Sequence, residues 1–150
     1  MKQVYLETIL LIERLHRRFL DVVKSELDRL KVEDINNVQT LILYNIGADQ
    51  LTVGELTNRG YYLGTNVSYN VKHLVQTEYL IQEKAPHDKR STRVRLSDKG
   101  LALVQKMDAL IERNVVDLDK RSPGLAFLTD VNKSMHNLER FWTEYMNRLY

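Results

Sequence analysis

The fold is decided by the stretch from Thr65 to Ser97, which reads TNVSYNVKHLVQTEYLIQEKAPHDKRSTRVRLS. Its first part spaces four apolar residues like one face of an α-helix, namely Val67, Val71, Leu74 and Val75. This spacing predicts a helix over about residues 65–77 that packs its apolar face into the core. The opposite face carries only side chains that can form hydrogen bonds: Thr65, Asn66, Ser68, Tyr69, Lys72, His73 and Gln76.

The second part of the stretch changes to the period of β-strands. Residues 79–84 and 93–97 predict two strands, and the polar residues 85–92 between them predict a turn. In the return strand, apolar residues alternate with arginines in the order Arg93, Val94, Arg95, Leu96. Because side chains of a strand alternate between its two faces, we expect a β-hairpin with one apolar face and one basic face.

Two shorter helices are predicted before this stretch. Asp34 is expected to cap the first of them, which ends at Gly47. Thr52 and Glu55 have the T-x-x-E spacing of a capping box, so a short helix starts there and stops at Gly60. Helix, tight bend, helix and basic hairpin is the order of a winged helix-turn-helix.

Long amphipathic helices are predicted at both ends of the chain. Apolar residues recur in steps of three and four from Tyr5 to Leu30, and the heptad-like pattern of the last helix runs from Leu128 to Leu149. The first helix would be roughly 40 Å long, which exceeds a small domain, so part of its apolar face must be covered elsewhere. Packing within the monomer would cover it, but a second copy is the better explanation. The expected dimerisation residues are Tyr5, Ile9, Leu128, Val131, Met135, Leu138, Trp142 and Tyr145.

We therefore expect a mainly α fold with a small β-hairpin wing in a single domain over residues 1–150. The winged helix-turn-helix would occupy residues 33–100, and the helical dimerisation part residues 1–32 and 101–150. Charge follows the same division. The whole chain carries a formal net charge of +2, but residues 59–99 hold eight basic and four acidic side chains, so this stretch carries +4 and the rest −2.

Missing residue types argue against several functions. The chain has no cysteine, which excludes disulfides, thiolate metal sites and cysteine nucleophiles. Its histidines are far apart, and the sequence has neither a nucleophile elbow nor a phosphate-binding glycine loop, so we predict no enzyme activity, no metal and no cofactor. No signal peptide is recognisable and no run approaches the roughly 20 apolar residues of a membrane span, which predicts a cytoplasmic protein.

The segment from Glu55 to Arg95 resembles the MarR family of bacterial transcriptional regulators. The family skeleton E-L-x(10)-V-S-x-x-V-x-x-L appears as Glu55, Leu56, Val67, Ser68, Val71 and Leu74. The wing motif appears as Asp88, Arg90, Arg93, Val94, Arg95, Leu96, Lys99 and Gly100. Residues 60–70 are similar to the LdtR-like branch of the family. The chain departs from the family at Glu78, where a glycine usually precedes the first wing strand, and at Gly60, where an apolar residue often closes the first helix of the pair.

The resemblance implies a homodimer that binds a pseudo-palindromic operator in double-stranded DNA, and that represses or has a dual role. The helix at 65–77 would enter the major groove, whose base edges suit Thr65, Asn66, Ser68, Tyr69, Lys72, His73 and Gln76. The wing at about 80–97 would lie at the minor groove, whose negative potential attracts the guanidinium of Arg90. Asp88 would position the wing, and Lys89, Arg93 and Arg95 would contact phosphates.

The resemblance also implies a small, often aromatic anion as effector. His16, Arg17 and Tyr44 are the candidates to bind it, since they combine positive charge, hydrogen bonding and a stacking ring. Two alternatives stay open. The hairpin could instead bind an acidic partner protein without DNA, or the chain could be a helical bundle that binds or converts a small molecule, although it offers no reactive constellation.

Overall fold

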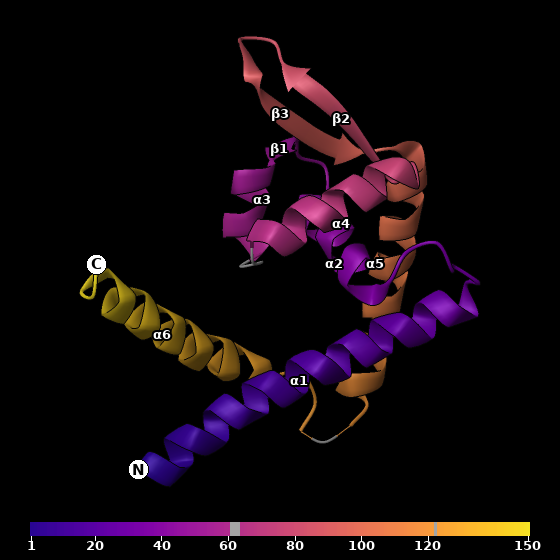
Figure 1. Cartoon of the computed structure of the whole chain (residues 1–150). Helices are drawn as coiled ribbons and strands as arrows, with labels where there is room; N and C mark the ends of the chain where they lie inside the picture. Colours follow the sequence, from indigo (N-terminus) through magenta and orange to yellow (C-terminus); the bar gives the residue numbers. More distant parts are fainter. Residues whose placement is uncertain (61–63, 122) are drawn as a thin grey trace. The chain divides into compact units, whose positions relative to one another are not determined.

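The computed structural model describes residues 1–60, 64–121 and 123–150, apart from the side chains of residues 60, 64, 65, 89 and 90. Its elements follow one another (Figure 1) as α1 (Lys2–Arg29), α2 (Asn37–Ile46), β1 (Leu51–Thr52), α3 (Val53–Gly60), α4 (Gly64–Gln76), β2 (Leu80–Ala85), β3 (Asp88–Leu96), α5 (Asp98–Asp119) and α6 (Phe127–Asn147). The chain divides into two compact units, Met1–Asp108 and Ala109–Tyr150. Helices with a small antiparallel sheet confirm the predicted fold class.

The core of the first unit lies where α2, α3 and α4 pack together. Five side chains contributed by these helices are 0% exposed: Ile42, Leu43, Leu56, Val67 and Leu74. Full burial of such a side chain contributes roughly 1.5–3 kcal/mol to folding. The C-terminal part of α1 packs against α2 and adds Val23 and Leu27 to this core.

The sheet has three strands in the order β1-β3-β2, all antiparallel. Leu51 of β1 pairs with Val94, and Leu80 of β2 pairs with Leu96. The sequence did not predict β1, because two residues are too short to show a period. β3 begins at Asp88 rather than at Arg93, which corrects the predicted turn to a shorter one. The reason is that main-chain pairing with β2 continues before Arg93, with Thr92 opposite Lys84 and, after an irregularity, Asp88 opposite Ala85, and this pairing needs no apolar pattern.

The start of α2 also differs from the prediction. Its N-cap is Asn36 and not Asp34. The side chain of Asn36 accepts a 2.8 Å hydrogen bond from the backbone N–H of Gln39, and the Gln39 side chain accepts one of 3.0 Å from the backbone N–H of Asn36. Asp34 is thereby left free for other partners. The predicted capping box of α3 is confirmed, with distances of 2.8 and 3.1 Å between Thr52 and Glu55.

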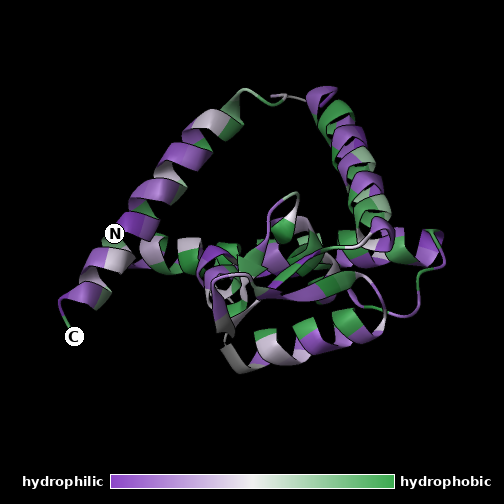
Figure 2. Cartoon of the chain, turned by 90° about the horizontal axis from the view of Figure 1, so that it is seen from above, coloured by the Kyte–Doolittle hydropathy of each residue, from purple (hydrophilic) through white to green (hydrophobic). Residues whose placement is uncertain are grey.

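The long helices at the ends of the chain expose most of their apolar side chains. In α1 only Val23, Glu26 and Leu27 are buried, and α6, all of whose residues are described, has no buried residue. Figure 2 shows polar and apolar residues mixed along the helix that ends at the C-terminus. None of the described helices is long and apolar enough to cross a membrane.

The turn between α4 and β2 uses a left-handed residue that is not glycine. Glu78 has φ 66°. The backbone N–H of Tyr79 donates to Leu74 at 2.9 Å and that of Glu78 to Val75 at 3.1 Å, which is the hydrogen-bond pattern of a Schellman motif. The turn that family members make with glycine is therefore kept, although a residue with a Cβ atom is strained in this conformation.

We predict that Glu78→Gly stabilises the protein by about 1 kcal/mol, since glycine adopts a positive φ without the Cβ penalty. Urea unfolding of the wild type and the variant measures this difference. Glu33→Gly is the matched control, because it removes the same exposed side chain from a position without a positive φ. A gain of stability in both variants, or in neither, would contradict the explanation.

Candidate nucleic-acid interface

The outer face of α4 is polar and exposed. Val67, Val71 and Leu74 are buried at 0%, 4% and 0% exposure, as the apolar spacing predicted. The exposed residues on this helix include Asn66, Ser68, Tyr69, Lys72 and Gln76. The aromatic ring of Tyr69 stands out because 70% of this residue is accessible to solvent. α4 thus presents donors, acceptors, a cation and an apolar ring in one strip, which are the groups that read base edges.

The wing places basic side chains on the outer face of the sheet. Val94 and Leu96 are buried at 1% and 4% exposure, so the neighbouring arginines of β3 face outward. Arg95 donates to the Glu83 carboxylate of β2 at 3.1 Å. This ion pair is exposed and worth at most about 1 kcal/mol, so a phosphate can compete for Arg95.

Three of the predicted DNA contacts lie outside the described side chains. These are Thr65 at the start of α4 and Lys89 and Arg90 near the tip of the wing. Asp88, which was assigned to position the wing, is exposed. The residues that suggested the LdtR-like branch include 61–63, which also lie outside the described residues.

Sequence reasoning missed a polar cluster at the C-terminal end of α4. The Asp34 carboxylate accepts hydrogen bonds of 2.8 Å from the hydroxyl of Tyr79 and of 2.8 Å from Nζ of Lys99. Nζ of Lys99 also donates to the backbone carbonyl of Thr77 at 2.9 Å and lies 4.2 Å from the centre of the Tyr79 ring. Lys99 belongs to the family motif, but no spacing in the sequence points to Asp34 as its partner.

Electrostatics in this cluster favour the charged form of Asp34. Partial burial alone would raise the pKa of Asp34, but hydrogen bonds from Lys99 and Tyr79 outweigh it and hold the pKa below its usual value. Burial, together with the hydrogen bond to Asp34, raises the pKa of Tyr79, so its hydroxyl keeps its proton. The cluster is therefore a carboxylate held by one cation and one neutral hydroxyl.

Two polar side chains of α4, those of Asn70 and His73, form intramolecular hydrogen bonds. Nε2 of His73 lies 2.9 Å from the backbone carbonyl oxygen of Asp34. Because a carbonyl oxygen only accepts, Nε2 of His73 carries the hydrogen. Nε2 of the buried Gln39 side chain in α2 donates to Oδ1 of Asn70 at 3.1 Å. His73 was predicted to read bases, and the structure gives it an intramolecular partner.

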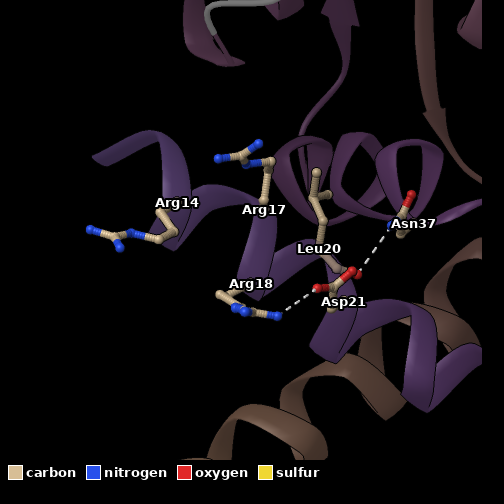
Figure 3. A pocket seen from close by; sticks show the side chains of 6 residues that line it. All are labelled: Arg14, Arg17, Arg18, Leu20, Asp21 and Asn37. Carbon is tan, nitrogen blue, oxygen red and sulfur yellow. Dashed lines mark hydrogen bonds and ion pairs between the residues drawn. The ribbon is translucent and has the colours of Figure 1, made fainter. Parts of the chain in front are cut away.

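A cavity of about 490 Å³ is lined by α1 and the start of α2, with Arg14, Arg17, Arg18, Leu20, Asp21 and Asn37 around it (Figure 3). Arg18 lies 3.7 Å from Asp21. The guanidinium groups of Arg14 and Arg17 are directed away from Asp21 in Figure 3, and neither has an ion-pair partner among the described residues. The cavity therefore has a positive lining.

Of the three residues predicted to bind an effector, only Arg17 lines this cavity. His16 is the exposed neighbour of Arg17 on α1. The hydroxyl of Tyr44 donates to Asp108 at 2.8 Å, and this hydrogen bond raises the pKa of Tyr44. The sequence could not find Arg14, Arg18 and Asn37, because basic residues on a long helix are usually solvated. Within the described part of the chain, no group of three His, Asp or Glu side chains is arranged to hold a metal ion.

The predicted dimerisation residues are accessible to different degrees. Tyr5, Val131 and Tyr145 are 43%, 37% and 54% exposed. The others are half-buried: Ile9, Leu128, Met135, Leu138 and Trp142.

The chain is similar to transcriptional regulators in sequence and in fold. The model of the MarR family matches residues 33–91. The exopolysaccharide II synthesis transcriptional activator ExpG of Rhizobium meliloti is 39% identical over 143 residues, which cover 92% of this chain and 71% of ExpG. A mutant of MarR from E. coli complexed with operator DNA has a TM-score of 0.66 at 22% identity, over 83% of this chain and 90% of MarR. BpsR of Bordetella bronchiseptica, whose DNA binding is regulated by 6-hydroxynicotinic acid, has a TM-score of 0.69 at 15% identity, over 89% and 98% of the two chains.

The Asp34 cluster predicts a pH dependence of stability. Because the pKa of Asp34 is lowered by folding, the stability that its charge contributes is present above the unfolded pKa and is lost as the pH falls through the folded value. Asp34→Asn should therefore be less stable than wild type at pH 7, and the difference should shrink below about pH 4. Urea unfolding between pH 7 and 3 measures this. The control Asp28→Asn, which breaks an exposed ion pair with Lys24, should change little at pH 7. A difference between Asp34→Asn and wild type that stays constant with pH would contradict the assignment.

Proposed function

The chain belongs to the MarR family of transcriptional regulators, and on that premise we propose that it binds a pseudo-palindromic operator as a homodimer. Like its relatives, it is a transcriptional regulator and not an enzyme. The observation that carries the proposal is the exposed polar face of α4, which lies opposite the buried Val67, Val71 and Leu74 and next to a basic wing. DNA binding also implies that the protein acts in the cytoplasm.

The side chains of α4 are suited to the major groove. Asn66 and Gln76 carry amides that can pair with adenine, and Lys72 can donate to the acceptors of guanine. The exposed Tyr69 offers an apolar ring for a thymine methyl group and a hydroxyl for a base edge or a phosphate. Arg93 and Arg95 of the wing supply phosphate contacts, which add affinity without sequence information.

Dimerisation is supported by the apolar faces of the long helices. A helix whose apolar stripe is uncovered needs a partner, and a second copy of the same helix offers a stripe of the same kind. Two copies related by a two-fold axis would place two α4 helices about one turn of DNA apart, which explains a pseudo-palindromic site. ExpG is an activator. A dual role, in which the position of the operator decides the outcome, is compatible with this and remains our proposal.

A small organic anion is the proposed effector. The cavity beside α1 brings together Arg14, Arg17 and Arg18 with only one carboxylate, Asp21. Guanidinium groups bind carboxylates in a bidentate manner, and Asn37, whose amide donates to the Leu20 carbonyl, also lines the cavity. The volume of about 490 Å³ suits a small molecule. Regulation of BpsR by 6-hydroxynicotinic acid shows that a neighbour in fold responds to an aromatic acid.

Selection of bound fragments from the host genome, followed by footprinting, tests operator binding. We expect protected half-sites about 10 base pairs apart between their centres. Binding must weaken steeply as salt is added, because several phosphate contacts release counterions. A chain that uses its wing on an acidic partner protein instead would select no fragments and would show no DNA binding to titrate.

Arg90→Ala should weaken operator binding by about 1–3 kcal/mol, because it removes the guanidinium assigned to the minor groove. Fluorescence anisotropy with labelled operator at physiological salt measures the loss. Lys24→Ala is the control, since it removes one positive charge from an exposed ion pair on α1. Wild-type affinity in Arg90→Ala would show that the wing is assigned wrongly.

The effector site predicts a ligand-dependent shift in melting temperature. In a screen of small carboxylates and phenols, some compounds should stabilise the wild type, by about 2.7 kcal/mol at 100 times their Kd. Arg17→Ala should lose most of this stabilisation. His16→Ala should retain it, because His16 does not line the cavity. The site would be refuted if every stabilising compound acted equally on wild type and Arg17→Ala.

A further inference from the structure

We propose that Asp34 and Gln39 are positioning residues, which set the sequence discrimination of the recognition helix α4 without touching DNA. The inference rests on the proposed function, because it assumes that α4 reads an operator. Both residues belong to residues 34–39, which comprise the end of the α1–α2 connection and the first residues of α2, and which we call the seat of α4. His73 then serves as an anchor of the helix to this seat and not as a base reader.

The seat holds α4 at two points. The carbonyl of Asp34 accepts from Nε2 of His73 at 2.9 Å, and Nε2 of Gln39 donates to Asn70 at 3.1 Å. Asn70 and His73 are three residues apart, so they lie on the same side of α4, one turn from each other. A helix held at one point can still roll about its axis, whereas two anchors a turn apart define both its rotation and its tilt.

Asp34 also fixes the end of α4 to the wing and to α5. Its carboxylate binds Tyr79, which directly precedes β2, and Lys99 in the first turn of α5. Lys99 in turn donates to the carbonyl of Thr77, just after α4, where a cation also favours the negative end of the helix dipole. One residue therefore connects the recognition helix, the wing and the following helix.

The remaining junction is packed too tightly to move alone. The hydroxyl of Ser97 donates to the carbonyl of Glu78 at 2.5 Å and accepts from the backbone N–H of Gly100 at 3.1 Å. A Cβ atom on Gly100 would lie 2.3 Å from the carbonyl oxygen of Tyr79, so only glycine fits there. With the wing and α5 joined in this way, the hydrogen bonds of the seat refine the position of α4 that its apolar packing sets.

This arrangement predicts a specific defect when the seat is broken. Base contacts require donors and acceptors aimed at particular atoms, whereas contacts with phosphates tolerate small rotations. Loss of an anchor should therefore reduce operator affinity about tenfold and leave affinity for a shuffled duplex unchanged within about twofold. Loss of a base-reading side chain would instead relax the preference at one position of each half-site.

The experiment compares Asp34→Ala, His73→Ala and His73→Gln with wild type and with the control Asp28→Asn, which lies in an exposed ion pair of α1. Each full-length protein is titrated with labelled operator and with a shuffled duplex of equal length at the same salt, well below its melting temperature. Base preferences are then measured by selection from a library of operator variants. His73→Gln is the rescue variant, since its amide can donate from nearly the position of Nε2.

Asp34→Ala keeps the carbonyl that accepts from His73 but removes the carboxylate that holds Tyr79 and Lys99 at the end of α4. We expect Asp34→Ala and His73→Ala to lose discrimination at all positions of the half-site, and His73→Gln and Asp28→Asn to retain it. Relaxed preference at a single position in His73→Ala, with no rescue by His73→Gln, would make His73 a base reader and overturn the inference. Unchanged discrimination in Asp34→Ala would overturn it as well. Absence of salt-sensitive DNA binding by the wild type would overturn the proposed function itself, and this outcome is distinguishable from the other two.

Discussion

Burial of the apolar face of α4 is the constraint on which the proposed interface depends. Val67 and Leu74 are completely buried. Rotating the helix by one residue, about 100°, would take these side chains out of the core and bring polar ones in. Each buried polar group without a partner would cost about 1–3 kcal/mol. The energy that stabilises the first unit therefore also turns Asn66, Lys72 and Gln76 outward. Packing fixes the face coarsely, and hydrogen bonds of Asn70 and His73 fix it finely.

In the wing, burial of alternate residues in the last part of β3 likewise determines which side chains face outward. Burial of Val94 and Leu96 leaves Arg93 and Arg95 no place except the outer face. Glu83 then balances part of this charge from the neighbouring strand. An exposed ion pair of this kind costs little to exchange for a phosphate. The Glu83 carboxylate therefore lowers the non-specific affinity of the wing for polyanions below what its arginines alone would give. More of the sequence discrimination is then left to α4.

The sequence was sufficient for several local patterns, although it placed the cap of α2 at Asp34 instead of Asn36. The apolar spacing of α4, the alternation in β3 and the capping box of Thr52 and Glu55 all predicted structure that the chain adopts. The sequence was insufficient where a residue's hydrogen-bond partner lies far away along the chain. The bond between Asp34 and Lys99 joins residues 65 positions apart, so local pattern assigned Asp34 to a helix cap instead. β1 was missed because its two residues show no period and its partner β3 lies about 40 positions further along the chain. The lining of the cavity was predicted only in part. Arg14 and Arg18 belong to it because α2 places Asn37 next to α1, and no local pattern in the sequence shows this.

Residues 34–39 contact both the arginine-lined cavity beside α1 and the recognition helix α4. Asn37 lines the arginine cavity and donates to the backbone carbonyl of Leu20 in α1 at 3.1 Å. Asp34 and Gln39, on either side of it, bond to α4. A ligand alters DNA binding only if its affinity differs between two arrangements of the protein. An anion that held Arg17 and Asn37 together would bind most tightly to one spacing of α1 and the seat. A change in that spacing would move the seat, and the hydrogen bonds of Asp34 and Gln39 would pass this movement to α4. The seat is thus the segment through which an anion bound beside α1 would act on the recognition helix.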